Sequence, residues 1–233
     1  MENWNVEAQS IIVSKTPALR SFRQFMNAPI YIAILIVVEL ALGIAPRADR
    51  LTWTLENFPV WLGVAWIGFN YKRFPLSQLC LMLLTVHSII LAVGGYYTYA
   101  KVPLGFWMQD WFGLARNHYD RIGHFVQGFV PAILVRELLI RHAKMPRTAW
   151  LPATTVMFCL GFSALFEVFE WLSVVVGGDA STDYLGTQGD IWDAQWDMLF
   201  CGFGALTAMI FLSRLHDGSL AKLPTPAPRS TAG

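Results

Sequence analysis

The sequence predicts an all-α protein: a polytopic membrane helix bundle of about six transmembrane helices with both termini in the cytoplasm. Three observations predict this fold class. Of the 233 residues, 55% are hydrophobic and only 14% are charged, whereas about a quarter of the residues in soluble domains are charged. Apolar stretches close to the ~20 residues needed to cross a bilayer recur along most of the chain. Lysines and arginines gather in short clusters between these stretches.

Six apolar segments are candidates for the transmembrane helices. They are residues 29–46, 53–70, 76–98, 118–140, 151–176 and 190–213. The second is the weakest candidate because it contains Glu56 and Pro59, and a shorter or tilted element there would leave five spans. Its tryptophans nevertheless suit a membrane interface.

The basic residues predict the orientation. With six spans, the side that holds both termini carries eleven of them: Lys15, Arg20, Arg23, Lys72, Arg73, Arg141, Lys144, Arg147, Arg214, Lys222 and Arg229. The opposite loops carry only Arg47, Arg50, Lys101 and Arg116. The positive-inside rule therefore places the termini in the cytoplasm. We expect a cytoplasmic segment over residues 1–28, a transmembrane helical domain over 29–213 and a disordered cytoplasmic tail over 214–233.

Composition excludes several classes of protein. The net charge is only +1, which argues against nucleic acid as a partner. Cys80, Cys159 and Cys201 all lie within apolar runs, so they indicate small buried side chains rather than a disulfide framework or a zinc knuckle. No apolar core precedes residue 29, so the N-terminus does not read as a cleaved signal peptide.

Three of the predicted helices carry ionisable side chains on one face. Such groups cost several kcal/mol in hydrocarbon unless they are paired, hydrated or bound to a ligand. The helical periodicity groups them as Asp120, His124 and Gln127; as Ser163, Glu167 and Glu170; and as Asp190, Asp193 and Asp197. Each group therefore needs an explanation.

The predicted topology brings the three faces to one depth. Helices four and six begin on the non-cytoplasmic side, and helix five ends there. His124 and Asp197 lie roughly 9–11 Å below the starts of their helices, and Glu170 lies roughly 9 Å below the end of its helix. Carboxylates gathered in this way repel one another unless cations, protons or countercharges join them.

A divalent metal ion is the simplest way to relieve the repulsion between these carboxylates, because Asp, Glu and His are ligands of zinc, manganese, magnesium or iron. No organic cofactor is expected. The predicted metal ligands are Asp120, His124, Glu167, Glu170, Asp193 and Asp197. The predicted catalytic residues are Glu167, Asp190 and Arg121. Asp190 also fits a helix cap, which we favour over a metal role, and Arg121 either neutralises a carboxylate or holds an anionic substrate.

Other polar residues have simpler explanations. Arg136 and Glu137 lie near the cytoplasmic end, where snorkelling or a local ion pair is sufficient. His118 is either a metal ligand or an ordinary interfacial side chain. The polar loop 186–189 is either a lid over the cluster or a tight turn into the sixth helix.

The spacing from Gly189 through Asp193 to Asp197 matches half of the metal site of the CDP-alcohol phosphotransferases, which are membrane enzymes that use divalent ions. Their second element, Asp-Gly-x-x-Ala-Arg, is missing, since the preceding region reads GGDASTD over residues 177–183. The match indicates a shared way of placing acids on a helix rather than membership of that family.

Three longer runs carry a resemblance. HYDRIGHFVQGF over residues 118–129, SALFEVFEW over 163–171 and LGTQGDIWDAQWDM over 185–198 resemble the YjdF-like family of bacterial inner-membrane proteins, and the resemblance spans most of the chain. That family is a domain of unknown function. The resemblance thus implies a multi-pass protein of the bacterial cytoplasmic (inner) membrane and no particular reaction or ligand.

The leading hypothesis is a membrane-embedded, divalent-metal-dependent hydrolase or transferase that acts from the outer side. Its partners would be the lipid bilayer and a lipid-linked or small anionic substrate, with the metal activating water or polarising a phosphoryl or acyl group. A proton- or cation-coupled transporter is the first alternative. The second is a structural membrane protein whose polar cluster only locks its helices together.

Overall fold

The computed structural model describes residues 28–177 and 187–223, and every regular element within these ranges is helical. The elements are the helix Ala28–Gly43, α2 (Arg50–Asn70), α3 (Gln78–Tyr97), the 3₁₀ helix η1 (Tyr99–Lys101), α4 (Pro103–Phe112), α5 (Tyr119–Arg141), α6 (Trp150–Gly177) and α8 (Asp193–Leu220). The predicted all-α fold is confirmed.

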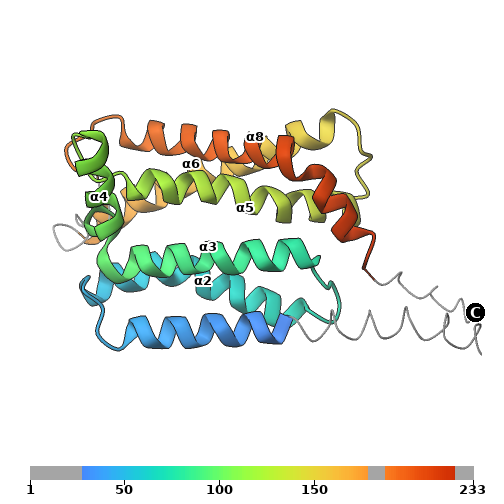
Figure 1. The fold of residues 1–233 in the computed structure, drawn as a ribbon, viewed down its shortest axis with the longest axis horizontal. Coiled ribbons are helices and arrows are strands. Elements are labelled where there is room, and N and C mark those ends of the chain that lie inside the picture. The colour runs from blue at the N-terminus through green and yellow to red at the C-terminus, as the bar shows by residue number, and fades with distance from the viewer. Residues whose placement is uncertain (1–27, 178–186, 224–233) are drawn as a thin grey trace, which may run out of the picture.

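Six of these helices lie lengthwise beside one another, so that the connections alternate between the two ends of the bundle (Figure 1). Each of the six helices begins within three residues of the first residue of one of the segments expected from hydropathy. Four of them, α3, α5, α6 and α8, are long and apolar enough to cross a membrane. The helix Ala28–Gly43 is apolar but shorter. Both described ends of the chain, residues 28 and 223, lie at the same end of the bundle.

Two elements differ from the expectation. Helix α8 continues to Leu220, so residues 214–220 are helical rather than part of a disordered tail. The extension is held in place because His216 is fully buried and the Ser219 hydroxyl accepts a hydrogen bond from the Leu79 amide. Residues 224–233 and 1–27 lie outside the described residues.

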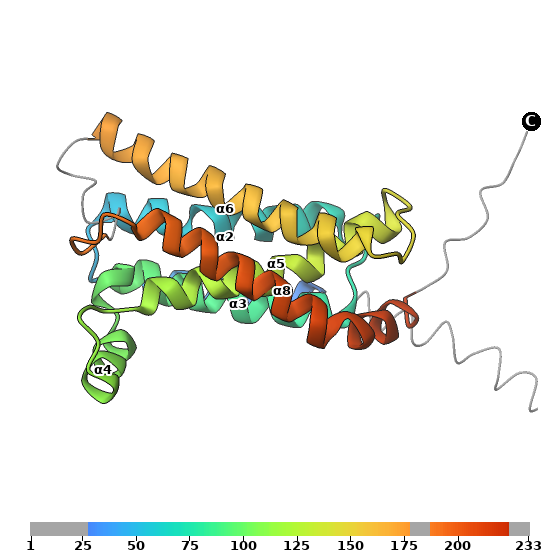
Figure 2. The ribbon, with the colours of Figure 1, turned by 90° about the horizontal axis from the view of Figure 1, so that it is seen from above.

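Helix α4 is the second difference. It lies across the ends of the long helices and projects from the bundle (Figure 2). Pro103 occupies its first turn and Gly113 ends it with a φ of 62°, as expected for the two ends of a helix. Trp107 and Trp111 are 55% and 69% exposed, which suits a membrane interface.

Helices α5 and α8 pack closely because glycines meet at their crossing. A Cβ atom on Gly128 would lie 1.8 Å from the Cys201 carbonyl oxygen, and one on Gly204 would lie 1.9 Å from the Phe125 carbonyl oxygen. Small residues allow such approaches between membrane helices. The crossing fixes the relative position of the two helices that carry most of the predicted site residues.

A buried ionic network lies at the end of the bundle where α5 and α8 end and α3 begins. Glu137 of α5 accepts hydrogen bonds from the Ser77 amide, from Arg141 and from His216. Arg136 donates to His216 Nδ1 at 2.9 Å and to Asp217 at 2.9 Å. Since Nδ1 accepts from a guanidinium, the Nε2 atom of His216 carries the proton that is donated to Glu137. Of the two explanations expected for Arg136 and Glu137, snorkelling is wrong, because these side chains are 4% and 0% exposed, and the local ion pair is confirmed.

Candidate functional site

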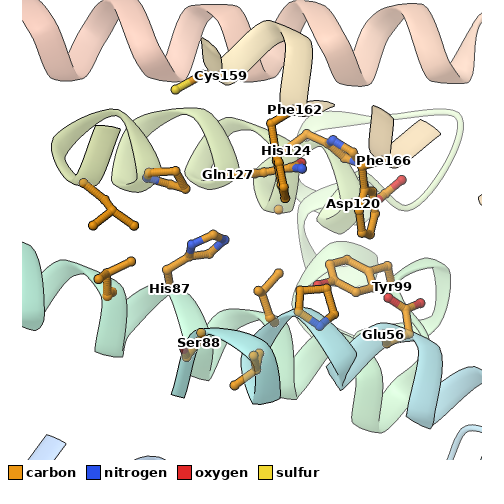
Figure 3. A pocket seen from close by; sticks show the side chains of 18 of the residues that line it. Glu56, His87, Ser88, Tyr99, Asp120, His124, Gln127, Cys159, Phe162 and Phe166 are labelled. Atoms are coloured by element: carbon orange, nitrogen blue, oxygen red, sulfur yellow. The ribbon is translucent and has the colours of Figure 1, made fainter. Parts of the chain in front are cut away.

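Three helices bring a cluster of acids and one histidine together at the end of the bundle where α5 and α8 begin. Asp120 and His124 lie one turn apart on α5, and Asp197 lies on α8; one ligand atom from each falls within 4.8 Å of the others. Glu167 of α6 joins them, with its Oε1 atom 3.6 Å from His124 Nε2. The Asp120 Oδ1 atom is also 3.6 Å from His124 Nε2. We call these four residues the acid–histidine cluster; Figure 3 shows Asp120 and His124 beside the adjoining cavity.

The distances within this cluster are those of a site that could hold a metal ion. A separation of 3.6 Å is too long for a good hydrogen bond. Ligands about 2.1 Å from a tetrahedral zinc ion stand about 3.4 Å from one another, close to the two measured distances. Oε1 of Glu167 and Oδ1 of Asp197 are buried acceptors with no hydrogen-bond partner. Buried acceptors of this kind need a cation, a proton or an ordered water as partner.

Two arginines neutralise the acids at the start of α8 and in the turn before it. Arg116 contacts Asp193 at 2.6 Å and lies 3.6 Å from Asp190, while Arg121 contacts Asp190 at 2.7 Å. The Asp190 carboxylate also accepts a hydrogen bond from the Trp192 amide. This backbone hydrogen bond and the two guanidinium groups lower the pKa of Asp190 from its ordinary value. Asp190 and Asp193 are therefore charge-paired, unlike the carboxylates of the acid–histidine cluster.

A tight turn holds the start of α8 against the start of α5. The Asn117 amide donates to the Gln188 side chain, which donates in return to the Asn117 carbonyl. Arg116 also donates to the Thr187 carbonyl at 2.8 Å. The turn needs positive φ at Gln188 (48°) and at Gly189 (85°), and glycine accepts this conformation at little cost. Residues 187–189 thus form a turn anchored to the segment just before α5, and Gly186 lies outside the described residues.

A cavity of about 340 Å³ opens beside the cluster. Asp120, His124 and Glu56 of α2 line it (Figure 3). Glu170 of α6 is also a lining residue. Glu170 lies within electrostatic range of Glu56, Asp120, Glu167 and Asp197. Most of the other lining residues are apolar side chains of α3, α5 and α6. Acidic groups therefore occupy one end of a largely hydrophobic chamber.

The structure divides the predicted site residues into three sets. Asp120, His124, Glu167 and Asp197 lie together; Glu170 faces the cavity; Asp193, Asp190 and Arg121 belong to the charge-paired group. His118 lies outside the acid–histidine cluster, where burial and the charges of Arg121 and Arg116 lower its pKa.

Sequence reasoning missed two residues. The sequence marks Glu56 only as a weakness of the second span, although it is 6% exposed and lines the cavity. Arg116 reads in the sequence as a loop charge, yet it is the principal partner of Asp193. A carboxylate inside an apolar helix was the available signal for Glu56; no local pattern marked Arg116.

Comparison with known proteins gives the context of the site. A family model described as "Predicted membrane protein (DUF2238)" matches residues 28–218. The chain is similar to the inner membrane protein YjdF of Escherichia coli (strain K12), with 45% identity over 174 residues, which are 75% of this chain and 83% of that protein. No solved structure matches. The matched region contains every residue of the acid–histidine cluster.

Proposed function

Because the chain belongs to the DUF2238 family of predicted membrane proteins, we propose that this multi-pass inner-membrane protein is a divalent-metal-dependent hydrolase or transferase that acts on a lipid-linked substrate. One observation carries the proposal: Asp120, His124 and Asp197 converge within 4.8 Å, beside a cavity with an apolar lining. The convergence supplies metal ligands from two helices, and the cavity supplies space for an apolar substrate.

Each residue of the site has a role in this proposal. Asp120, His124 and Asp197 hold the ion, which would supply Lewis acidity toward a phosphoryl or acyl oxygen. Glu167 completes the ligand set or acts as general base from its position 3.6 Å from His124. Arg116 positions the first turn of α8 through Asp193. Asp190 pairs with Arg121 and accepts a hydrogen bond from the Trp192 amide in the turn before α8, so its role is structural rather than catalytic.

The proposed topology has six spans, with both termini in the cytoplasm. The excess of basic residues at the end that holds residues 28 and 223 supports this orientation. It places the acid–histidine cluster beneath the outer surface of the membrane. The ionic network around Glu137 then lies near the cytoplasmic surface.

Metal analysis of the purified protein tests the proposal. We expect about one zinc, manganese, magnesium or iron ion per chain after gentle purification without chelators. Asp197→Asn and His124→Ala should lose it, because each removes a ligand. Asp110→Asn should retain the metal. It is the same change from aspartate to asparagine, but on the exposed surface of α4 at the same end of the protein.

Three outcomes would contradict the proposal. The absence of stoichiometric metal in the wild-type protein would favour the structural alternative. Retention of metal in both ligand variants would place the ion elsewhere. Uptake of the bound metal into proteoliposomes, without headgroup release from lipids of the inner membrane, would favour the cation transporter.

A further inference from the structure

The cavity beside the acid–histidine cluster extends far into the bundle. Along α5 its lining residues run from Asp120 to Val135, which at 1.5 Å per residue is about 22 Å. The midplane of a bilayer lies about 15 Å below the edge of its hydrocarbon core. The cavity is therefore long, narrow and directed toward the middle of the membrane.

One wall of this cavity is open toward the surroundings of the bundle. Phe158 and Phe162 of α6 line the cavity and are 57% and 54% exposed. On the opposite edge, Gly63 of α2 also lines the cavity, and a Cβ atom there would meet no other atom within 4 Å. The opening thus lies between α2 and α6, at a depth where the surroundings are hydrocarbon.

The contents of such a cavity follow from its chemistry. Water gains few hydrogen bonds from a wall of Leu, Val, Pro and Phe side chains, and apolar cavities tend to exclude it. A hydrocarbon chain undergoes no change of polarity when it leaves the bilayer for such a wall, and packing contacts with the wall offset the conformational entropy that it loses. The polar end, with Glu56, Asp120 and Glu170, would meet the group attached to that chain.

We propose that a single hydrocarbon chain of a membrane lipid enters sideways between α2 and α6 and lies in this cavity, with its headgroup at the acid–histidine cluster. The inference rests on the proposed function and names its substrate class: a lipid that reacts at the junction of chain and headgroup. His87 and Ser88 of α3 and Gln127 of α5 also line the cavity and are polar groups beside the chain.

A plug in the opening tests this inference. Gly63→Phe should obstruct the mouth, because a Cβ atom at this position meets no atom within 4 Å and leaves the ring space at the opening. Gly161→Phe is the matched control: Gly161 also has open space around it, lies on α6 and does not line the cavity. The probe is phosphatidylglycerol with a diazirine in one acyl chain, incorporated in nanodiscs, with the crosslinked peptides identified by mass spectrometry.

The wild-type protein and Gly161→Phe should give adducts on the cavity faces of residues 84–91 and 158–166. Gly63→Phe should lose them, and the smaller Gly63→Leu should reduce them. Adducts that persist unchanged in Gly63→Phe, or that fall only on outward residues such as Leu165, would overturn the inference. Both phenylalanine variants should keep the metal content of the wild type. If no variant holds metal but the plug still blocks the adducts, the proposed enzyme fails and the lipid-binding cavity stands.

Discussion

Gly128→Ala should prevent the accumulation of folded protein in the membrane. The added methyl group would lie 1.8 Å from the Cys201 carbonyl oxygen on α8, and the next nearest atoms are also backbone, so no side chain can rotate away to relieve the clash. Overpacking typically costs about 1–3 kcal/mol, and a backbone clash this close should reach or exceed the upper figure. The measurement is the fraction of monodisperse protein after detergent extraction, with its unfolding temperature.

Two variants control this experiment. Gly204→Ala should have the same effect from the other helix, because its methyl group would lie 1.9 Å from the Phe125 carbonyl oxygen. Gly161→Ala should be neutral or slightly stabilising, since alanine favours a helix over glycine by up to about 1 kcal/mol and the site is open. Equal yields for all three variants would contradict the close packing of α5 and α8.

Glu137→Ala should destabilise the protein by about 3–5 kcal/mol, the usual effect of removing one partner from a buried ion pair. The substitution leaves Arg141 and His216 without the carboxylate that accepts their hydrogen bonds. It also leaves the Ser77 amide unpaired at the start of α3. Thermal unfolding in detergent micelles, followed by the loss of monodisperse protein, measures the effect.

Arg147→Gln is the matched control for Glu137→Ala. Arg147 belongs to the same group of charges, at 3.2 Å from Asp217, but its side chain is 54% exposed. Exposed ion pairs contribute about 0–1 kcal/mol, so the unfolding temperature should barely change. A large effect of Arg147→Gln together with a small effect of Glu137→Ala would show that the stabilising charges are not those at the centre of the network.

The helices were predictable because a bilayer makes hydropathy and segment length nearly sufficient to locate them. Helix α4 was not, since its ten residues are too short to produce a spanning signal and it lies across the others. The length of α8 was underestimated for a related reason. Arg214, His216 and Asp217 lower the hydropathy of its last turns, yet His216 is fully buried through its contacts with α5.

Helical periodicity and helix direction predict which site residues share a helix face and lie at the same end of the bundle. Asp120 and His124 share a face of one helix, and the alternation of helix direction placed Asp197 and Glu167 at the same end. Periodicity does not determine which acid pairs with which base, so Arg116 and the division between the paired and unpaired acids emerged only in three dimensions. Glu56 was missed because the side on which α2 packs depends on its contacts with α3, which its own pattern does not encode.

Helix α4 bears on how the protein responds to the thickness of its membrane. Trp107 and Trp111 lie on a helix that crosses the ends of the long helices, and tryptophan prefers the layer between headgroups and acyl chains. An anchor of this kind sets the height of the nearest helix ends relative to that layer, so a thinner or thicker bilayer would be accommodated mainly at the opposite end. The acids would then remain at a constant distance from the lipid headgroups in membranes of different composition.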